Sequence, residues 1–170
     1  MVVRVCRMGK GRQGSTGTPA TVALTRAGIA FTPRSYEHDP AAESFGIEAA
    51  EALGVEPARV VKTLLVQTDS GLAVGVVPVD RQLDLKAIAG AVGSKKATMA
   101  DPAAAERSTG YVVGGISPIG QKRALPTVLD DSALDHPTVL VSGGRRGLDL
   151  ELSPADLVAA TRATTAPIAR

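Results

Sequence analysis

The sequence predicts a single α+β domain in which helices flank a mixed, largely antiparallel sheet. The fold class rests on two patterns: capped helices recur along the chain, and several short strands follow one another near the C-terminus without helices between them. The 170 residues, 44% hydrophobic and 21% charged, can bury a core without disulfides or metals. Aromatic residues make up only 2% of the chain, so we expect a core of Val, Leu, Ile and Ala.

Six segments carry helix signals, which are a polar or proline start and, in several cases, a glycine at the end. Thr18 and Pro19 begin the first of them and Gly28 ends it. Pro57 begins the third, and Asp101 with Pro102 begins the fifth. The predicted helices are residues 18–28, 46–54, 56–62, 84–93, 101–108 and 153–163.

The predicted strands are short and rich in Val and Leu. Residues 29–39 are expected to be extended, and Pro33 indicates an edge position because proline cannot donate to a neighbouring strand. A β-hairpin is predicted around the turn at residues 69–71. Further strands are expected at 111–113, 126–130, 138–142 and 148–152, the last two joined by a glycine-rich turn.

The net charge of +2 is unevenly distributed along the chain. Residues 1–19 contain four basic residues and no acid, so the remainder holds 15 basic and 17 acidic residues. We predict that residues 1–17 form a disordered tail and residues 18–170 the domain, because the first segment is rich in Gly, Ser and Thr without periodicity. The tail is either an inert leader or a weak nucleic-acid-attracting arm.

Several classes of protein do not fit this composition. The chain has no apolar run of the roughly 18 residues that a membrane span needs, and its first residues lack a secretory signal. Cys6 is the single cysteine, which fits a cytoplasmic protein. The histidines are His38 and His136, and neither lies in a zinc-binding pattern, so we expect no metal and no cofactor. Four aromatic residues are too few for a stacking platform for single-stranded nucleic acid.

The stretch GYVVGGISPIGQKRALP, residues 110–126, has the G-x-x-x-x-G spacing of a phosphate-binding loop but not its chemistry. A P-loop continues with Lys and Ser or Thr, whereas Gln121 follows the second glycine here, and Pro118 removes a backbone donor. Ser117 is not in a G-x-S-x-G nucleophile elbow. The stretch therefore predicts neither a nucleotide site nor a serine hydrolase.

Lys62 stands out among the polar residues at element ends, because Val60 and Val61 precede it and TLLV follows it. A lysine among apolar neighbours either directs its ammonium to a carboxylate, a cavity or a ligand, or extends it into solvent, and both readings stay open. The adjacent acids Asp130 and Asp131 are expected to be solvated.

The segments VVKTLLV, ADPAAAERSTGYVVGGISPIGQKRALPTVLD and VSGGRRGLDLELSPADL, with TPATVALTRAGIAFTPRSYEHDP before them, resemble the YbaK family of free-standing aminoacyl-tRNA deacylases. That family is similar to the editing domain inserted in bacterial prolyl-tRNA synthetases. The resemblance covers roughly residues 18–170, in order and with matching spacing. It implies a barrel-like sheet flanked by helices.

The activity implied by the resemblance is hydrolysis of cysteinyl-tRNA for proline. A synthetase pocket discriminates between near-isosteric amino acids by only about 1–3 kcal/mol, so a second site must remove what the first admits. The implied mechanism uses the thiol of the substrate cysteine to attack its own ester carbonyl. The implied partners are the acceptor end of aminoacyl-tRNA and prolyl-tRNA synthetase.

The resemblance also implies the site residues. Lys62 of KTLL would be the catalytic residue, orienting the 3′ end of the substrate and offsetting charge near the scissile ester. The implied substrate-binding residues are Tyr36, Phe45, Gly114, Gly115, Ser117, Pro118, Gly120, Arg145 and Asp149. Two alternatives stay open: a binding or regulatory module without catalysis, and a deacylase for another small aminoacyl group such as alanyl.

Overall fold

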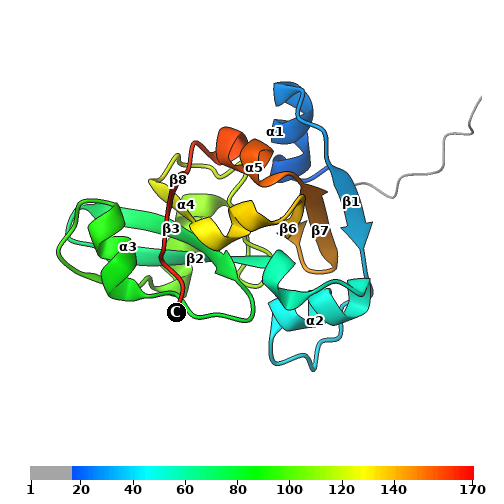
Figure 1. Cartoon of the computed structure of the whole chain (residues 1–170), viewed down its shortest axis with the longest axis horizontal. Coiled ribbons are helices and arrows are strands. Elements are labelled where there is room, and N and C mark those ends of the chain that lie inside the picture. The colour runs from blue at the N-terminus through cyan, green and yellow to red at the C-terminus, as the bar shows by residue number, and fades with distance from the viewer. Residues whose placement is uncertain (1–16) are drawn as a thin grey trace, which may run out of the picture.

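The computed structural model describes residues 17–170, which form two β-sheets with helices around them (Figure 1). The predicted disordered tail, residues 1–17, lies outside the described residues except for Gly17. The mixed, largely antiparallel α+β architecture predicted from the sequence is confirmed.

The smaller sheet contains three antiparallel strands in the order β1 (Thr32–Ser35), β7 (Leu148–Leu152) and β6 (Val139–Arg145). Strand β1 lies at the edge, as Pro33 predicted. Strands β6 and β7 form the predicted hairpin, with an irregular register between Ser142 and Arg145.

The larger sheet contains five strands and both strand directions. Its order is β4 (Ala97–Met99), β2 (Val61–Thr68), β3 (Gly71–Pro78), β5 (Thr127–Asp130) and β8 (Thr164–Ala166). The predicted β2–β3 hairpin is present, whereas the β3–β5 and β5–β8 pairs are parallel. An isolated parallel bridge between Val60 and Leu140 connects the two sheets where β2 begins.

The helices begin where the sequence places capping residues. They are α1 (Pro19–Ala27), α2 (Phe45–Leu53), α3 (Leu85–Ala91), α4 (Pro102–Thr109) and α5 (Pro154–Thr161), with the 3-10 turns η1 (Pro57–Arg59) and η2 (Asp131–Asp135). At α1, for example, the Thr18 hydroxyl accepts a hydrogen bond from the Thr21 N–H at 3.2 Å, which satisfies a donor that the first helical turn leaves unpaired. The helix predicted for residues 56–62 is only the turn η1, because Val61 and Lys62 already pair with β3.

Aliphatic side chains fill the core, as the composition predicted. The largest cluster lies between α1, α5 and the inner faces of both sheets, and it includes Leu24, Val76, Val141, Leu150 and Leu157. A second cluster lies beneath α3 on the larger sheet. Burial of a Val, Leu or Ile side chain contributes about 1.5–3 kcal/mol, so these clusters hold the sheets and helices together.

Two further details of the sequence prediction are wrong. Residues 111–113 form a turn and not a strand: the Gly115 N–H donates to the Val112 carbonyl at 2.9 Å, and Tyr111 is buried while its two neighbours are exposed. The Asp130 carboxylate is not solvated, since the residue is 1% exposed and accepts backbone hydrogen bonds from Ile168 and Ala169.

Candidate active site

A cavity of about 420 Å³ lies along one edge of β2. Residues 61–65 all line it, although consecutive side chains of a strand project to opposite faces. A cavity that contacts five consecutive residues must therefore run along the strand edge. The ladder between β2 and β4 covers only residues 66–68, which leaves the first half of this edge open to the cavity.

Lys62 extends its side chain from this strand into the cavity wall. The residue is half-buried, and burial lowers the pKa of its ammonium, an effect that the negative charge of Asp80 partly opposes. The sequence left open whether the Lys62 ammonium is directed to a cavity or extends into solvent, and the structure favours the cavity. A cation in a partly dehydrated wall interacts strongly with a ligand charge that enters.

Asp149 supplies the cavity with an acidic group from β7. The residue is 6% exposed, and burial raises the pKa of its carboxyl to about 6. Tyr36, which also lines the cavity, has a pKa raised to about 12, first by burial and then by the charge of Asp149. The Tyr36 phenol therefore lies near the Asp149 carboxylate, with Asp149 buried and Tyr36 half-buried.

Phe45, the first residue of α2, lines the cavity and contacts the side chains of Arg146 and His38. The Arg146 guanidinium carbon is 4.6 Å from the centre of its ring, and the His38 ring centre is 5.6 Å away. Arg146 also donates from Nη2 to the Val113 carbonyl at 2.9 Å. Arg146 therefore connects α2 to the turn that contains Gly114, across the cavity wall.

Gly114 fits this contact because it has no side chain. Its φ is +91°, a conformation that favours glycine, and an added Cβ would lie 2.5 Å from Arg146 Nε and 3.0 Å from Phe45 Cε2. Gly115 lies against the backbone of Arg145, where a Cβ would be 2.9 Å from the Arg145 Cα. The two glycines let the turn approach both the cavity wall and the β6–β7 hairpin.

The sequence of residues 39–160 matches the family model described as an aminoacyl-tRNA editing domain. The chain belongs to this family. A protein of Enterococcus faecalis with the provisional name Cys-tRNA(Pro)/Cys-tRNA(Cys) deacylase EbsC is 42% identical over 120 residues, which are 70% of this chain and 73% of the relative. A proline–tRNA ligase of Desulforamulus reducens is 32% identical over 73 residues, 43% of this chain and 13% of the ligase.

Solved structures agree with the family assignment. A crystal structure described as that of a provisional trans-editing enzyme for prolyl-tRNA synthetase superposes with a TM-score of 0.81 and 28% identity, covering 92% of this chain and 98% of the other. The structure of the hypothetical protein APE2540 gives the same TM-score and identity, covering 90% of this chain and 100% of the other. The editing-domain fold expected from the resemblance is therefore confirmed.

Within this editing domain, the structure brings six of the predicted site residues to the cavity and places four outside its lining. The six are Tyr36, Phe45, Lys62, Gly114, Arg145 and Asp149. Gly115 is the first of the four: it lies between the lining residues Gly114 and Ile116 but packs against the backbone of Arg145.

Ser117, Pro118 and Gly120 are the other three; Pro118 is buried, and Ser117 and Gly120 have structural contacts elsewhere. The Ser117 hydroxyl is fully buried and accepts from the Ile119 N–H at 3.2 Å. A Cβ on Gly120 would lie 2.6 Å from the Pro19 carbonyl oxygen at the start of α1. These contacts indicate that residues 117–120 hold the loop against α1 and do not form the cavity wall.

The cavity of this editing domain also contains polar residues that the sequence did not single out, notably Glu43, Ser44, Thr63 and Ser142. The one available signal was the position of Thr63 directly after Lys62 in KTLL.

No helix in residues 17–170 is both long and apolar enough for a membrane span. The same residues hold no group of three or more His, Cys, Asp or Glu side chains arranged to bind a metal ion.

Proposed function

We propose that this chain is a trans-editing deacylase that removes cysteine from cysteinyl-tRNA for proline. The observation that carries the proposal is the cavity on β2, which combines apolar walls with two charged groups, Lys62 and Asp149, that are partly or largely dehydrated. A cavity of about 420 Å³ accommodates a small aminoacyl group with part of the terminal ribose. Membership of the editing family and the name of the E. faecalis relative support the same substrate class.

The proposed chemistry uses a nucleophile carried by the substrate. Of the described residues that line the cavity, none is Cys or His, so the lining offers neither a cysteine nucleophile nor a histidine base for the hydroxyls of Ser44, Thr63 and Ser142. In our proposal the cysteine sulfur attacks the carbonyl carbon of its own ester, and the bond from that carbon to the ribose oxygen breaks. The thiol proton passes to the ribose oxygen, and water then opens the resulting thiolactone to free cysteine.

In this mechanism the protein contributes position and charge. The Lys62 ammonium offsets the negative charge that develops on the carbonyl oxygen, an interaction that is strong where water is excluded. Holding the thiol next to the ester carbon accelerates the reaction by proximity, which contributes several kcal/mol in well-oriented systems. Alanyl and prolyl esters carry no thiol and would persist.

The proposed partner is the acceptor end of tRNA, in the cytoplasm where tRNA is charged. The similarity of 73 residues to part of a proline–tRNA ligase supports cooperation with prolyl-tRNA synthetase. The alternative proposals are a binding module without catalysis and a deacylase for alanyl-tRNA.

Deacylation assays with cysteinyl-tRNA and alanyl-tRNA for proline separate these functions. We expect the protein to hydrolyse only the cysteinyl ester. This activity should be absent in Lys62→Ala and unchanged in Lys96→Ala, because Lys96 is exposed and outside the cavity lining. Faster loss of the alanyl ester would assign the other deacylase activity and overturn the thiol mechanism. Binding of both substrates without turnover would assign the binding module.

A further inference from the structure

Thr63 carries a buried hydroxyl without a partner. Of all buried side-chain nitrogen and oxygen atoms in residues 17–170, only Thr63 Oγ1 makes no hydrogen bond. Other buried threonines of the sheet are satisfied locally: Thr68 donates to the Gly71 carbonyl at 2.8 Å and Thr127 to the Leu125 carbonyl at 3.0 Å. A buried hydroxyl left unpaired destabilises the protein, so its retention calls for a partner that binds.

The position of Thr63 on β2 shows where that partner would come from. The residue lines the cavity between Lys62 and Leu64, on the edge that β4 leaves uncovered. The Leu65 carbonyl accepts a hydrogen bond from the Ala100 N–H at 3.0 Å at this edge. Because backbone groups of alternate strand residues point to the same side, the N–H and C=O of Thr63 also face this edge.

The surroundings of the hydroxyl are apolar. Val61 and Leu65, which share the strand face of Thr63, belong to the main core cluster, and Ala105 and Ile116 of the same cluster also line the cavity. Among the charged residues of the cavity, Lys62 projects from the opposite strand face and Asp149 comes from β7, while Glu43 precedes α2 and Arg145 ends β6. A single hydroxyl in an apolar wall selects for a ligand with one polar atom at that point.

We propose that Thr63 is a substrate-binding residue whose hydroxyl bonds to a polar atom of the aminoacyl group of the substrate. This inference rests on the proposed function, because it takes the occupant of the cavity to be an aminoacyl ester. The polar atom is either the thiol or one of the amino and carbonyl groups common to all aminoacyl esters. A site that pairs a buried hydroxyl only when the substrate is bound discriminates against substrates that cannot satisfy it.

The substitution Thr63→Val tests this role, because valine keeps the shape and removes the hydroxyl. We expect kcat/KM for cysteinyl-tRNA to fall about tenfold or more, while the Tm stays the same or rises because an unpaired buried group is removed. Thr63→Ser restores the hydroxyl and should keep kcat/KM within about threefold of the unsubstituted protein.

The matched control is Thr127→Val on β5. Its hydroxyl is bonded to Leu125, so this substitution should lower the Tm and leave kcat/KM unchanged. Opposite responses of the two variants are therefore expected. Unchanged turnover in Thr63→Val would overturn the inference, because the hydroxyl would then have no role in the reaction. A lowered Tm in that variant would also overturn it, because the hydroxyl would then have a structural role.

The substrate comparison identifies the atom that Thr63 contacts. A Kd for cysteinyl-tRNA that rises in Thr63→Val while the Kd for alanyl-tRNA stays unchanged assigns the thiol, whereas equal rises for both assign the shared amino or carbonyl group. Failure of the unsubstituted protein to hydrolyse cysteinyl-tRNA would refute the proposed function. Failure of the Thr63 inference alone would appear as full activity in both the unsubstituted protein and Thr63→Val.

Discussion

The carboxyl group of Asp149 is charged at neutral pH in a place where burial opposes charge. Its pKa rises from the ordinary 3.8 to about 6 because the residue is only 6% exposed. Between about pH 4 and 6 the folded protein therefore binds a proton that the unfolded chain has lost. The free energy of unfolding consequently falls as the pH rises through this window and is constant above it.

The substitution Asp149→Asn should stabilise the protein at pH 7 while impairing deacylation. The stability gain has an upper limit of about 3 kcal/mol, since one pKa unit corresponds to about 1.4 kcal/mol. Urea unfolding at pH 4 and pH 7 measures it: the difference from the unsubstituted protein should be near zero at pH 4 and largest at pH 7. A variant that is less stable at pH 7 would show that the carboxylate has compensating contacts.

Residues of the site differ in how far the sequence revealed them. Lys62 was identifiable because a lysine between Val61 and a run of apolar residues is unusual, and the resemblance then gave it a role. Asp149 came from the resemblance alone, since an acid in a short strand normally faces solvent. For Thr63 the sequence offered only its position after Lys62 in KTLL, because whether a hydroxyl has a partner depends on how the strands pack around it.

At the scale of elements, Arg146 and Gly114 connect α2, the turn after α4 and the β6–β7 hairpin around the cavity. Gly114→Ala should lower kcat/KM at least tenfold, because the new Cβ would displace Arg146 from Phe45 and Val113. It should also lower stability by about 1 kcal/mol, the cost of a side chain at positive φ.

The control for Gly114→Ala is Gly28→Ala. Gly28 ends α1 with a φ of +68°, and a Cβ added there would have no atom within 4 Å. This variant should lose similar stability and keep full activity. Chemical denaturation with steady-state kinetics on both variants separates backbone strain from damage to the cavity. Equal activity in the two variants would contradict a role for the Arg146 contact.

The Asp130 side chain attaches the C-terminal segment to the end of β5. It accepts hydrogen bonds from the N–H groups of Ile168 and Ala169, both at 2.9 Å, and from Ser132. Asp130→Asn replaces one acceptor oxygen with a donor and should destabilise the protein by about 1–3 kcal/mol. Asp131→Asn is the neighbouring control on an exposed residue and should change the Tm by less than about 1 °C, measured by thermal unfolding.

Elements were predictable to the extent that their signals are local. Polar caps and glycines mark both ends of α1, and a two-residue turn marks the β2–β3 hairpin, so both were correct. Strands β4 and β8 were missed because each has three residues and pairs with a strand far away in the sequence. Residues 111–113 have strand-like composition, but the Tyr111 hydroxyl donates to the Ile119 carbonyl at 2.7 Å and holds a turn there.

At the scale of the whole molecule, the fold class was predictable and the strand order was not. Capped helices and closely spaced strands specify α+β, but the order β4-β2-β3-β5-β8 depends on three pairings between distant segments, of which β2–β4 is antiparallel and β3–β5 and β5–β8 are parallel. The joining of the two sheets at Val60 and Leu140 is equally non-local. This joining matters for function, because it places β2 and β7 on the same cavity and so brings Lys62 and Asp149 to one site.

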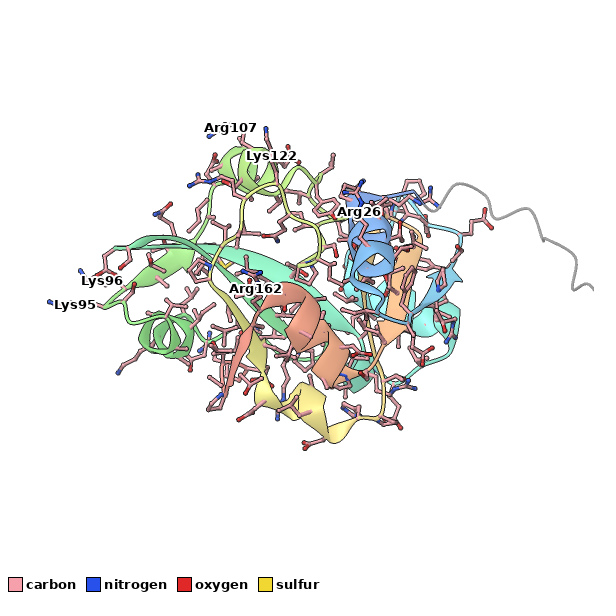
Figure 2. All side chains as sticks on the ribbon, turned by 90° about the horizontal axis from the view of Figure 1, so that it is seen from above. Arg26, Lys95, Lys96, Arg107, Lys122 and Arg162 are labelled. Atoms are coloured by element: carbon pink, nitrogen blue, oxygen red, sulfur yellow. The ribbon has the colours of Figure 1, made fainter. Side chains whose placement is uncertain are left out.

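The distribution of acidic and basic residues predicts weak binding of tRNA that carries no amino acid. Residues 17–170 hold 15 basic and 17 acidic residues, and in Figure 2 Lys95 with Lys96, Arg107 with Lys122, and Arg162 lie at separate places on the molecule. Affinity for nucleic acid comes largely from phosphate neutralisation, which needs several cations along one path. Recognition is therefore expected at the acceptor end, where Arg145 lines the cavity.

Uncharged tRNA for proline should bind the chain lacking residues 1–16 with a Kd of about 1 μM or weaker. The logarithm of the affinity should fall with the logarithm of salt concentration with a slope no steeper than roughly −2, because only about two phosphates are neutralised. Fluorescence anisotropy over a salt series measures both quantities, and Thr18, the cap of α1, is kept in this chain. Charge reversal at Lys95 and Lys96 should leave the Kd and the salt slope unchanged, since these residues do not line the cavity. Nanomolar affinity or a steep slope would instead reveal a continuous phosphate-binding surface and place the tRNA body, not only its end, on the protein.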